Sequence, residues 1–188
     1  PEILVKNIPP TTETDFNIQK PEIYFGEKTN NYVIVNTDEM EFDYPSGADN
    51  VETIYEGKAG INLSFFNRLM FSIRKGSYRM MISNNIDSNS KILINRNIMQ
   101  RVTEIAPFMY YDPDAYIVVN QDDGKLYWII EGFTVSNRFP YSQPTDIFIK
   151  GMSVNYIRNS VKVVIDAYDG TIDFYVADEN DPIIKTYD

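Results

Sequence analysis

The acidic side chains of the segment VVIDAYDGTIDFYVADENDP, residues 163–182, are the first candidates for chemistry in this chain. Apolar and polar residues alternate on both sides of an Asp-Gly pair, which predicts two antiparallel strands joined by a tight turn. With a two-residue turn, Asp166 would lie opposite Asp173, and such a pair of like charges is unfavourable unless a cation lies between them. With a four-residue turn, Asp166 would lie opposite Thr171 instead. The alternation fits both registers, so a divalent cation bound by Asp166 and Asp173 is one of two interpretations.

Basic side chains gather in a second candidate region, between Ser64 and Thr103. This stretch holds seven basic residues and one acidic residue, in a chain whose net charge is −10. Six of the basic residues are candidates for contact with an anionic surface such as lipid headgroups: Arg68, Arg74, Lys75, Arg79, Arg96 and Arg101. We expect at least four of the six to be exposed on one side of the domain. The alternative is that the basic stretch docks on the acidic remainder of the chain.

The residue types that are missing exclude several kinds of site. The chain contains no cysteine and no histidine. Disulfides, thiolate nucleophiles, histidine general bases and metal sites built on these ligands are therefore excluded within it. The excess of acidic residues argues against binding to nucleic acid, because phosphates attract a basic surface. No cofactor is expected apart from the divalent cation considered above.

The remaining carboxylates allow a weaker, enzymatic hypothesis. Two acids can hydrolyse a glycosidic bond without histidine, and Trp128 could provide a platform for a sugar ring. However, Asp112, Asp114, Asp122 and Asp123 lie at predicted turns, where aspartate commonly binds the backbone. No calcium loop of the helix-loop-helix type is present. Apolar neighbours on both sides of Trp128 favour a place in the core, so we lean towards a protein without enzymatic activity.

Strands and a few helices are the elements that must position these residues. Residues 1–21 carry four of the ten prolines and predict an extended arm, whereas residues 22–188 predict one globular domain. Short strands are predicted at 22–25, 32–36 and 91–95, helices within 62–76 and 97–105, and hairpins over 115–135 and 160–178. This pattern is typical of an α+β fold: a mostly antiparallel sheet built from hairpins, with two or three packed helices.

The helix within residues 62–76 has the clearest amphipathic pattern. Phe66, Leu69, Met70 and Ile73 follow each other at helical spacing and share one face. We expect this face to be buried against the sheet. Gly76 is suited to end the helix because it can adopt a left-handed backbone conformation.

Several long stretches of the chain carry a more specific signal. They are IYFGEKTNNYVIVNTDEMEFDYPSG, YEGKAGINLSFFNRLMFSIRKG, RNIMQRVTEIAPF, LYWIIEGFTVSNRFPYSQP and NYIRNSVKVVIDAYDGTIDFYVADENDPII. In this order they resemble an uncharacterised protein family of large bacterial multi-pass integral membrane proteins. The resemblance extends from about residue 23 to residue 184. It departs at DPDAY, where the family tends to have proline directly before the tyrosine.

The resemblance implies a location and partners, and it implies no activity. The parent protein would have a bundle of transmembrane helices followed by a long extracytoplasmic region, and this chain would be a single domain of that region or a fragment of one. We therefore expect a non-enzymatic domain on the extracytoplasmic face of the cell membrane. The absence of cysteine is compatible with the outside of a Gram-positive bacterium. Its expected partners are its own transmembrane bundle, an envelope component or an anionic lipid surface. The alternatives are a carboxylate-based enzyme acting on envelope glycans and a divalent-cation-sensing domain.

Overall fold

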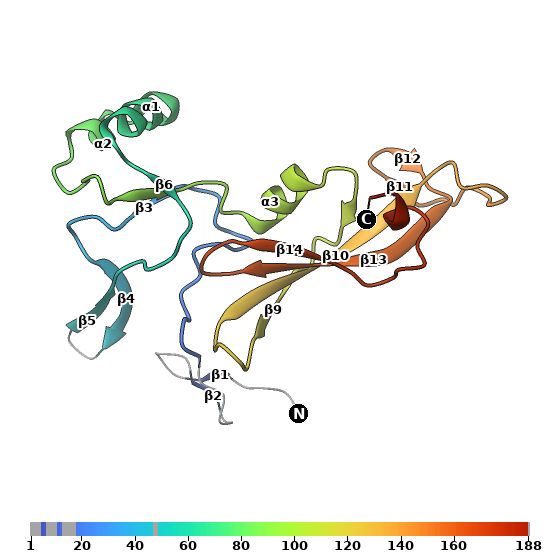
Figure 1. Ribbon diagram of the computed structural model, residues 1–188, viewed down its shortest axis with the longest axis horizontal. Coiled ribbons are helices and arrows are strands. Elements are labelled where there is room, and N and C mark those ends of the chain that lie inside the picture. Colours follow the sequence, from blue (N-terminus) through green and yellow to red (C-terminus); the bar gives the residue numbers. More distant parts are fainter. Residues whose placement is uncertain (1–4, 7–10, 13–17, 47–48, 188) are drawn as a thin grey trace.

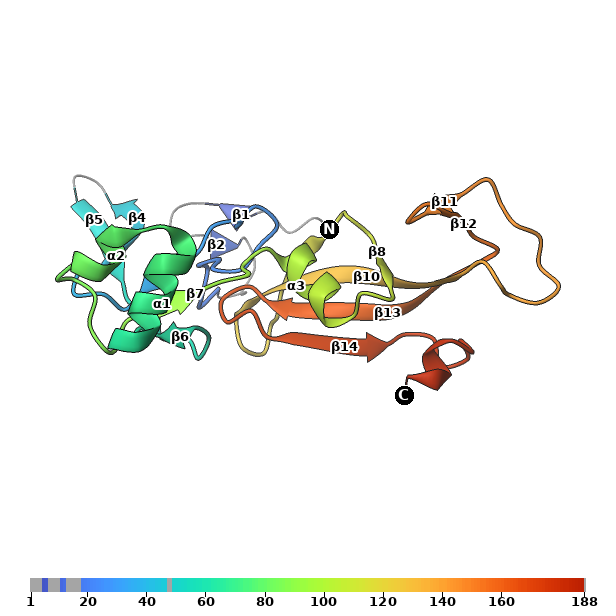
Figure 2. The ribbon, with the colours of Figure 1, turned by 90° about the horizontal axis from the view of Figure 1, so that it is seen from above.

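The computed structural model describes residues 5–6, 11–12, 18–46 and 49–187, and it is elongated (Figures 1 and 2). Two helices and small sheets form one end, a larger sheet with a third helix forms the middle, and a hairpin projects at the other end. The extended arm predicted for residues 1–21 lies mostly outside the described residues. Of it, only the short pair of strands β1 (Val5–Lys6) and β2 (Thr11–Thr12) and residues 18–21 are described.

The larger sheet confirms both predicted hairpins. Its strands are antiparallel, in the order β14-β13-β10-β8, and β9 also pairs with β10. The strands are β8 (Tyr110–Tyr111), β9 (Tyr116–Val119), β10 (Leu126–Ser136), β13 (Tyr156–Asp166) and β14 (Ile172–Val176). The described residues form three α-helices beside antiparallel sheets, so the architecture is α+β, as the sequence predicts.

Helix α3 (Ile98–Ile105) lies on one face of this sheet and closes the main core (Figure 1). Asn97 caps it, because its side-chain oxygen accepts a hydrogen bond of 3.0 Å from the backbone N–H of Gln100. Ile98 and Val102 are fully buried. They belong to the same cluster as the inward-facing side chains of β10 and β13: Ile130, Val161, Val163 and Ile165.

A smaller unit adjoins the main core. Strands β3 (Val33–Val35), β7 (Lys91–Leu93) and β6 (Ile61–Asn62) form a sheet in that order. Beside it are α1 (Phe65–Lys75) and α2 (Tyr78–Ile82), and a hairpin of β4 (Glu41–Ser46) and β5 (Asp49–Thr53) extends from the same end (Figure 1). Its own small core consists of Leu63, Met80, Ile86 and Ile92.

The strand predicted at residues 22–25 is wrong. Tyr24 and Phe25 follow each other directly and are both buried, whereas a strand would point them to opposite sides. Their backbone N–H groups both donate to the carbonyl of Ala167, at 2.9 Å. The segment is therefore an irregular connection held on the turn between β13 and β14. Trp128 packs against the main core, as expected, and donates from Nε1 to the carbonyl of Phe25 at 2.9 Å.

Two of the aspartates at predicted turns accept hydrogen bonds from the backbone. Asp112 accepts a hydrogen bond from the N–H of Asp114, and Asp123 accepts one from the N–H of Lys125, each at 3.0 Å.

The remaining elements are the projecting hairpin of β11 (Phe148–Ile149) and β12 (Met152–Ser153), and a 3-10 helix, η1 (Ile184–Thr186).

Candidate functional site

The six basic residues singled out in the sequence divide into two groups of three. Arg74, Lys75 and Arg79 are exposed at the end of the molecule formed by α1 and α2. Arg68, Arg96 and Arg101 are only partly exposed, and each guanidinium donates to backbone carbonyls. The expectation of at least four exposed basic groups is therefore wrong. Docking on acids is not observed either, because no described carboxylate forms an ion pair with any of the six.

Arg68, from the second group, determines how α1 is oriented. It lies on the inner side of α1, and its guanidinium donates to the carbonyls of Met80, Met81, Ser83 and Ile86. The distances to the carbonyls of Met80, Met81 and Ile86 lie between 2.6 and 2.9 Å. These carbonyls belong to α2 and the loop after it. Arg68 therefore links α1 to α2 through hydrogen bonds. The sequence had predicted that the apolar face of α1 would make the inward contacts of this helix.

The apolar stripe of α1 consequently faces solvent. Phe66, Met70 and Ile73 are 67%, 50% and 69% exposed, so the prediction that this face is buried is wrong for these three residues. Leu69, the fourth residue of the predicted face, is half-buried. Phe65 at the start of the helix is exposed too, as are Tyr78 and Ile82 on α2. We call these six apolar side chains, together with three exposed cations, the α1–α2 surface: Phe65, Phe66, Met70, Ile73, Tyr78, Ile82, Arg74, Lys75 and Arg79.

The local sequence explains how α1 is held in this orientation. The helix begins after Ser64 and ends at Gly76, whose backbone has a φ of 62°. Ser72, one turn after Arg68, is buried, and its hydroxyl donates to the carbonyl of Arg68 at 2.7 Å. Arg74 and Lys75 lie in the last turn, where positive charge is favourable next to the helix dipole.

The other arginines hold the main core together. Arg96 donates to the carbonyl of Tyr24 at 2.7 Å, and Arg101 donates to that of Gly170 at 2.7 Å while lying over the ring of Phe25. Burial lowers the pKa of both guanidinium groups. These two arginines therefore link chain segments and are not available to an anionic surface.

The hairpin of β13 and β14 has the four-residue turn. Ile165 pairs with Ile172 and Val164 with Asp173, and the N–H of Asp166 donates to the carbonyl of Thr171. Asp166 is buried, accepts hydrogen bonds from the N–H groups of Tyr168 and Asp169, and lies 3.2 Å from Nζ of Lys125. Asp173 is exposed on the neighbouring strand.

The repulsion that suggested a cation between Asp166 and Asp173 is thus avoided by the turn. Lys125 already compensates the charge of Asp166. Within the described residues, no three carboxylates gather in a group that could hold a metal ion. The cation hypothesis therefore loses the observation that motivated it.

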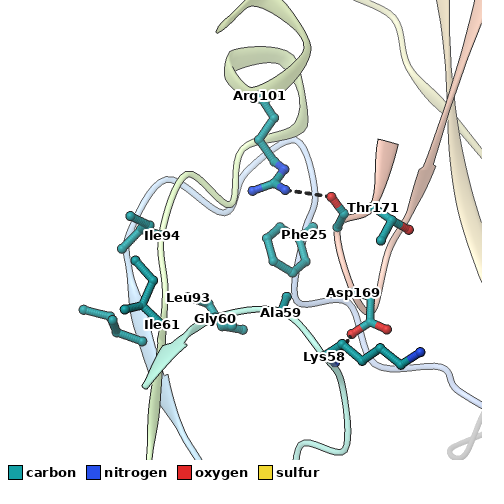
Figure 3. A pocket seen from close by; sticks show the side chains of 12 residues that line it. Phe25, Lys58, Ala59, Gly60, Ile61, Leu93, Ile94, Arg101, Asp169 and Thr171 are labelled. Atoms are coloured by element: carbon teal, nitrogen blue, oxygen red, sulfur yellow. Dashed lines mark hydrogen bonds between the residues drawn. The ribbon is translucent and has the colours of Figure 1, made fainter. Parts of the chain in front are cut away.

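A pocket of about 410 Å³ lies beside this turn (Figure 3). Apolar side chains such as Phe25, Ile61 and Leu93 line it, and Asp169 is its one lining carboxylate among the described residues. That carboxylate accepts hydrogen bonds from the Tyr55 hydroxyl and the N–H of Lys58, both at 2.9 Å. Gly170 closes one side, where a Cβ would lie 2.6 Å from the ring of Phe25. The Asp169 carboxylate is thus engaged with the chain itself.

A second pocket, of about 400 Å³, contains three acids. Glu22, Glu41 and Asp43 line it together with Arg96 and the exposed ring of Phe42. Burial and a short hydrogen bond to Glu41 raise the pKa of Tyr24. One carboxylate oxygen of Glu22 is buried without a hydrogen-bond partner among the described residues. This pocket is the place where paired carboxylates could act on a substrate.

Asp181 is a buried carboxylate that the sequence did not single out. It accepts hydrogen bonds from the hydroxyls of Thr134, Ser160 and Tyr156 and from the N–H of Ile183. Burial opposes its ionisation, but these four donors outweigh burial and hold its pKa below the usual range. Because all four donors belong to the chain, Asp181 fixes the C-terminal segment on the sheet.

The apolar members of the α1–α2 surface are the residues that sequence reasoning misplaced. Two features of the sequence bear on their position. The first is that the segment from Ile61 to Ile86 contains four basic residues and no acidic residue. Arg68 and Ser72 also share the helix face opposite to the apolar stripe, at a spacing of four residues. Neither observation alone distinguishes an inward-facing arginine from an ordinary exposed one.

Among the described residues, no helix has both the length and the apolar character that crossing a membrane requires. No solved structure matches the chain.

Curated relatives match it over its whole length. A UPF0182 protein of Alkaliphilus metalliredigens and one of Desulfitobacterium hafniense are each 54% identical to it, and one of Clostridium botulinum is 51% identical. The alignments cover 100% of this chain and 19%, 19% and 20% of those proteins. The chain thus spans about a fifth of the length of the curated relatives it matches. Residues 1–188 also match the family described as "Uncharacterised protein family (UPF0182)". The chain therefore belongs to this family.

Proposed function

We propose that the chain is a non-enzymatic interaction domain on the extracytoplasmic face of the cell membrane, within a larger multi-pass membrane protein. Its role in this proposal is to pack on the membrane-embedded part of that protein or on a component of the cell envelope. The single observation that carries the proposal is the α1–α2 surface, which leaves six large apolar side chains exposed at one end of the molecule. Exposed apolar side chains gathered in one place are typical of interaction sites.

Two further observations support this proposal. The relatives are about five times as long as the chain, so each of them has ample additional sequence to provide a membrane-embedded partner. The carboxylates of Asp169, in the apolar pocket, and of Asp181 are engaged with the chain itself, which is typical of structural roles.

Topology can be tested by labelling one residue in living cells. Tyr141 is fully exposed on the segment before the projecting hairpin, and the chain itself has no cysteine. We expect Tyr141→Cys in the full-length protein, freed of any other cysteine, to react with a membrane-impermeant maleimide in intact cells. Ile130→Cys, which is fully buried, is the matched control and should react only after denaturation. Labelling of Tyr141→Cys only after cell lysis would place the domain on the cytoplasmic side and overturn the proposal.

The acidic pocket favours a second candidate function, a carboxylate-based enzyme acting on envelope glycans. Glu22 and Glu41 line one pocket beside the exposed ring of Phe42, and glycoside hydrolysis requires two carboxyl groups in one cleft. The test is release of reducing ends from bacterial cell-wall glycan. If this candidate is correct, Glu22→Gln and Glu41→Gln each abolish the release, whereas Glu179→Gln, on the exposed surface, leaves it unchanged. Absence of release by the unaltered chain rejects it.

A further inference from the structure

The orientation of α1 is built into the chain. Four carbonyls receive the Arg68 guanidinium and the buried Ser72 hydroxyl lies on the same side, so the inner face of the helix is the polar one. Rotating the apolar stripe inwards would break these contacts and leave the carbonyls without their donor, which is costly for buried groups. The stripe is therefore displayed on a preformed helix.

The charges around the stripe indicate which kind of partner fits. From Ile61 to Ile86 the sequence has no acidic residue, although the whole chain carries an excess of ten negative charges. Arg74, Lys75 and Arg79 are exposed there, and Lys75 also lies over the ring of Tyr32, at 5.4 Å. The positive surface ends at the loop after α2, where Glu39 binds Asn85 at 2.6 Å. A partner for this surface has to be apolar and anionic at once.

A bilayer containing anionic lipids has both properties within a few ångströms of depth. A helix with aromatic and aliphatic side chains on one face, bordered by basic residues, characteristically lies in the plane of the lipid interface. At 11 residues, α1 is about 16 Å long, which suits a helix lying along the surface and is too short for a span. The exposed rings of Phe65, Phe66 and Tyr78 are of the kind that favours the boundary between headgroups and acyl chains.

We propose that the α1–α2 surface binds the interface of an anionic lipid bilayer. Phe66, Met70 and Ile73 enter the boundary between headgroups and acyl chains, and Arg74 and Arg79 contact the anionic headgroups. Lys75, on the Arg68 side of α1 and over the ring of Tyr32, adds to the positive charge near the surface. This inference rests on the proposed function in one respect, because it names lipid as the partner of the surface that carries that proposal. It assigns α1 and α2 the role of an interfacial anchor that keeps the domain against the membrane.

Vesicle co-sedimentation of the 188-residue chain tests the proposal. We expect binding to vesicles of equimolar phosphatidylcholine and phosphatidylglycerol, stronger at low than at physiological salt, and much weaker binding to phosphatidylcholine alone. Because each interfacial cation contributes about fivefold to partitioning, replacing Arg74, Lys75 and Arg79 by Gln should reduce it on the order of 100-fold. The double variant Phe66→Ser and Ile73→Ser should reduce it on the order of tenfold or more, because it removes inserted apolar area.

Matched controls separate this surface from general charge and general hydrophobicity. Replacing Lys28, Arg138 and Lys185 by Gln removes the same charge from exposed sites outside the α1–α2 surface. Tyr141→Ser with Phe148→Ser removes exposed apolar side chains from the opposite end of the molecule. Both controls should bind like the unaltered chain. All the replaced side chains are exposed, so an unchanged melting temperature verifies the fold, and Phe65→Ser with Ile82→Ser provides a second apolar variant.

Three results would overturn the proposal: no binding, equal binding to neutral and anionic vesicles, or an equal loss in the control variants. A photo-crosslinking residue at position 66 of the full-length protein gives an independent reading in native membranes, where adducts to lipid support the proposal and adducts to protein alone refute it. Vesicle binding does not depend on the side of the membrane on which the domain lies. Its failure is therefore distinguishable from failure of the maleimide labelling.

Discussion

Helix α3 turns Ile98 and Val102 into the main core, whereas helix α1 turns Phe66 and Ile73 towards solvent. Both helices are amphipathic with the same spacing of apolar residues. They differ in what lies on the other face: α3 has Gln100 and Glu104 outward, but α1 has Arg68 and Ser72 inward, bonded to the chain. The comparison teaches that periodicity identifies an apolar face without identifying what that face contacts.

The two regions also satisfy an inward-facing charge in different ways, a half-buried cation in one and a buried anion in the other. In the α1–α2 end, a cation is satisfied by backbone carbonyls contributed by α2 and its loop. In the sheet, the anion of Asp181 is satisfied by three hydroxyls and one N–H. Arg68 thus holds α2 and the following loop on α1, and Asp181 holds the C-terminal segment on the sheet, each through several directional hydrogen bonds. The predictions that follow test the contrast between the inward and outward apolar faces, and then the contributions of Asp181 and Arg68.

The largest expected effect separates the two apolar faces. Ile98→Ala removes a fully buried side chain from the main core and should lower the free energy of unfolding by about 3.5 kcal/mol. Ile73→Ala makes the same chemical change on the outward stripe and should lower it by about 0.5 kcal/mol or less. Urea unfolding followed by tryptophan fluorescence measures both, since Trp128 lies at the main core. Similar losses in the two variants would mean that the stripe of α1 is buried in solution.

The next effect concerns Asp181. Asp181→Asn should lower the free energy of unfolding by about 2.5 kcal/mol at neutral pH, because its hydrogen bonds involve a charged acceptor. Asp173→Asn, on the exposed part of β14, is the matched control and should change little.

The pH dependence of this loss has a defined sign. The pKa of Asp181 is lower in the folded than in the unfolded state, where it is about 4. Its contribution is therefore fully present above pH ~4 and is lost as pH falls from that value through the folded-state pKa. The difference between the unaltered chain and Asp181→Asn should shrink in this acidic window. A difference that stays constant down to acidic pH would contradict the assignment of the charge to Asp181.

A smaller and local effect is expected at Arg68. Arg68→Lys keeps the charge but loses the planar group that reaches several carbonyls at once, and should destabilise the α1–α2 end by about 1.5 kcal/mol. Native-state hydrogen exchange should show faster exchange in α1 and α2 with unchanged protection in β10 and β13. Arg79→Lys, whose side chain is exposed, is the control. Uniformly faster exchange throughout the chain would show that the two ends unfold together.

Much of the fold was predictable because its signals are local. The Asp-Gly turns, the alternation in β10 and β13 and the Asn97 cap of α3 each follow from short stretches of sequence. The hairpin register was left open because both turn lengths put Val163 and Ile165 on the core side. The structure selects the longer turn, in which Asp166 binds the N–H groups of Tyr168 and Asp169.

The site was less predictable because its residues are defined by distant partners. Arg68 is turned inward by carbonyls 12 to 18 residues later, and Arg101 is held by Gly170, 69 residues away. A basic residue in an amphipathic helix gives no indication of such contacts. The irregular path of Tyr24 and Phe25 similarly depends on Ala167, and the sequence reads as a strand there because its residues are apolar and aromatic.

The smallest expected effect on stability is at the exposed cations of α1. They can be compared directly with Arg68, the inward-facing cation of the same helix. Arg74→Gln with Lys75→Gln should lower the free energy of unfolding by only about 0.5 kcal/mol, mainly through the lost interaction with the dipole of α1. The loss should fall further in high salt, because exposed charges are screened. Thermal unfolding at low and high salt measures it, with Lys185→Gln and Arg138→Gln as the control of equal charge. A large loss would mean that these cations hold the fold as Arg68 does. A small loss of stability together with a large loss of vesicle binding is the result expected if these cations bind a partner.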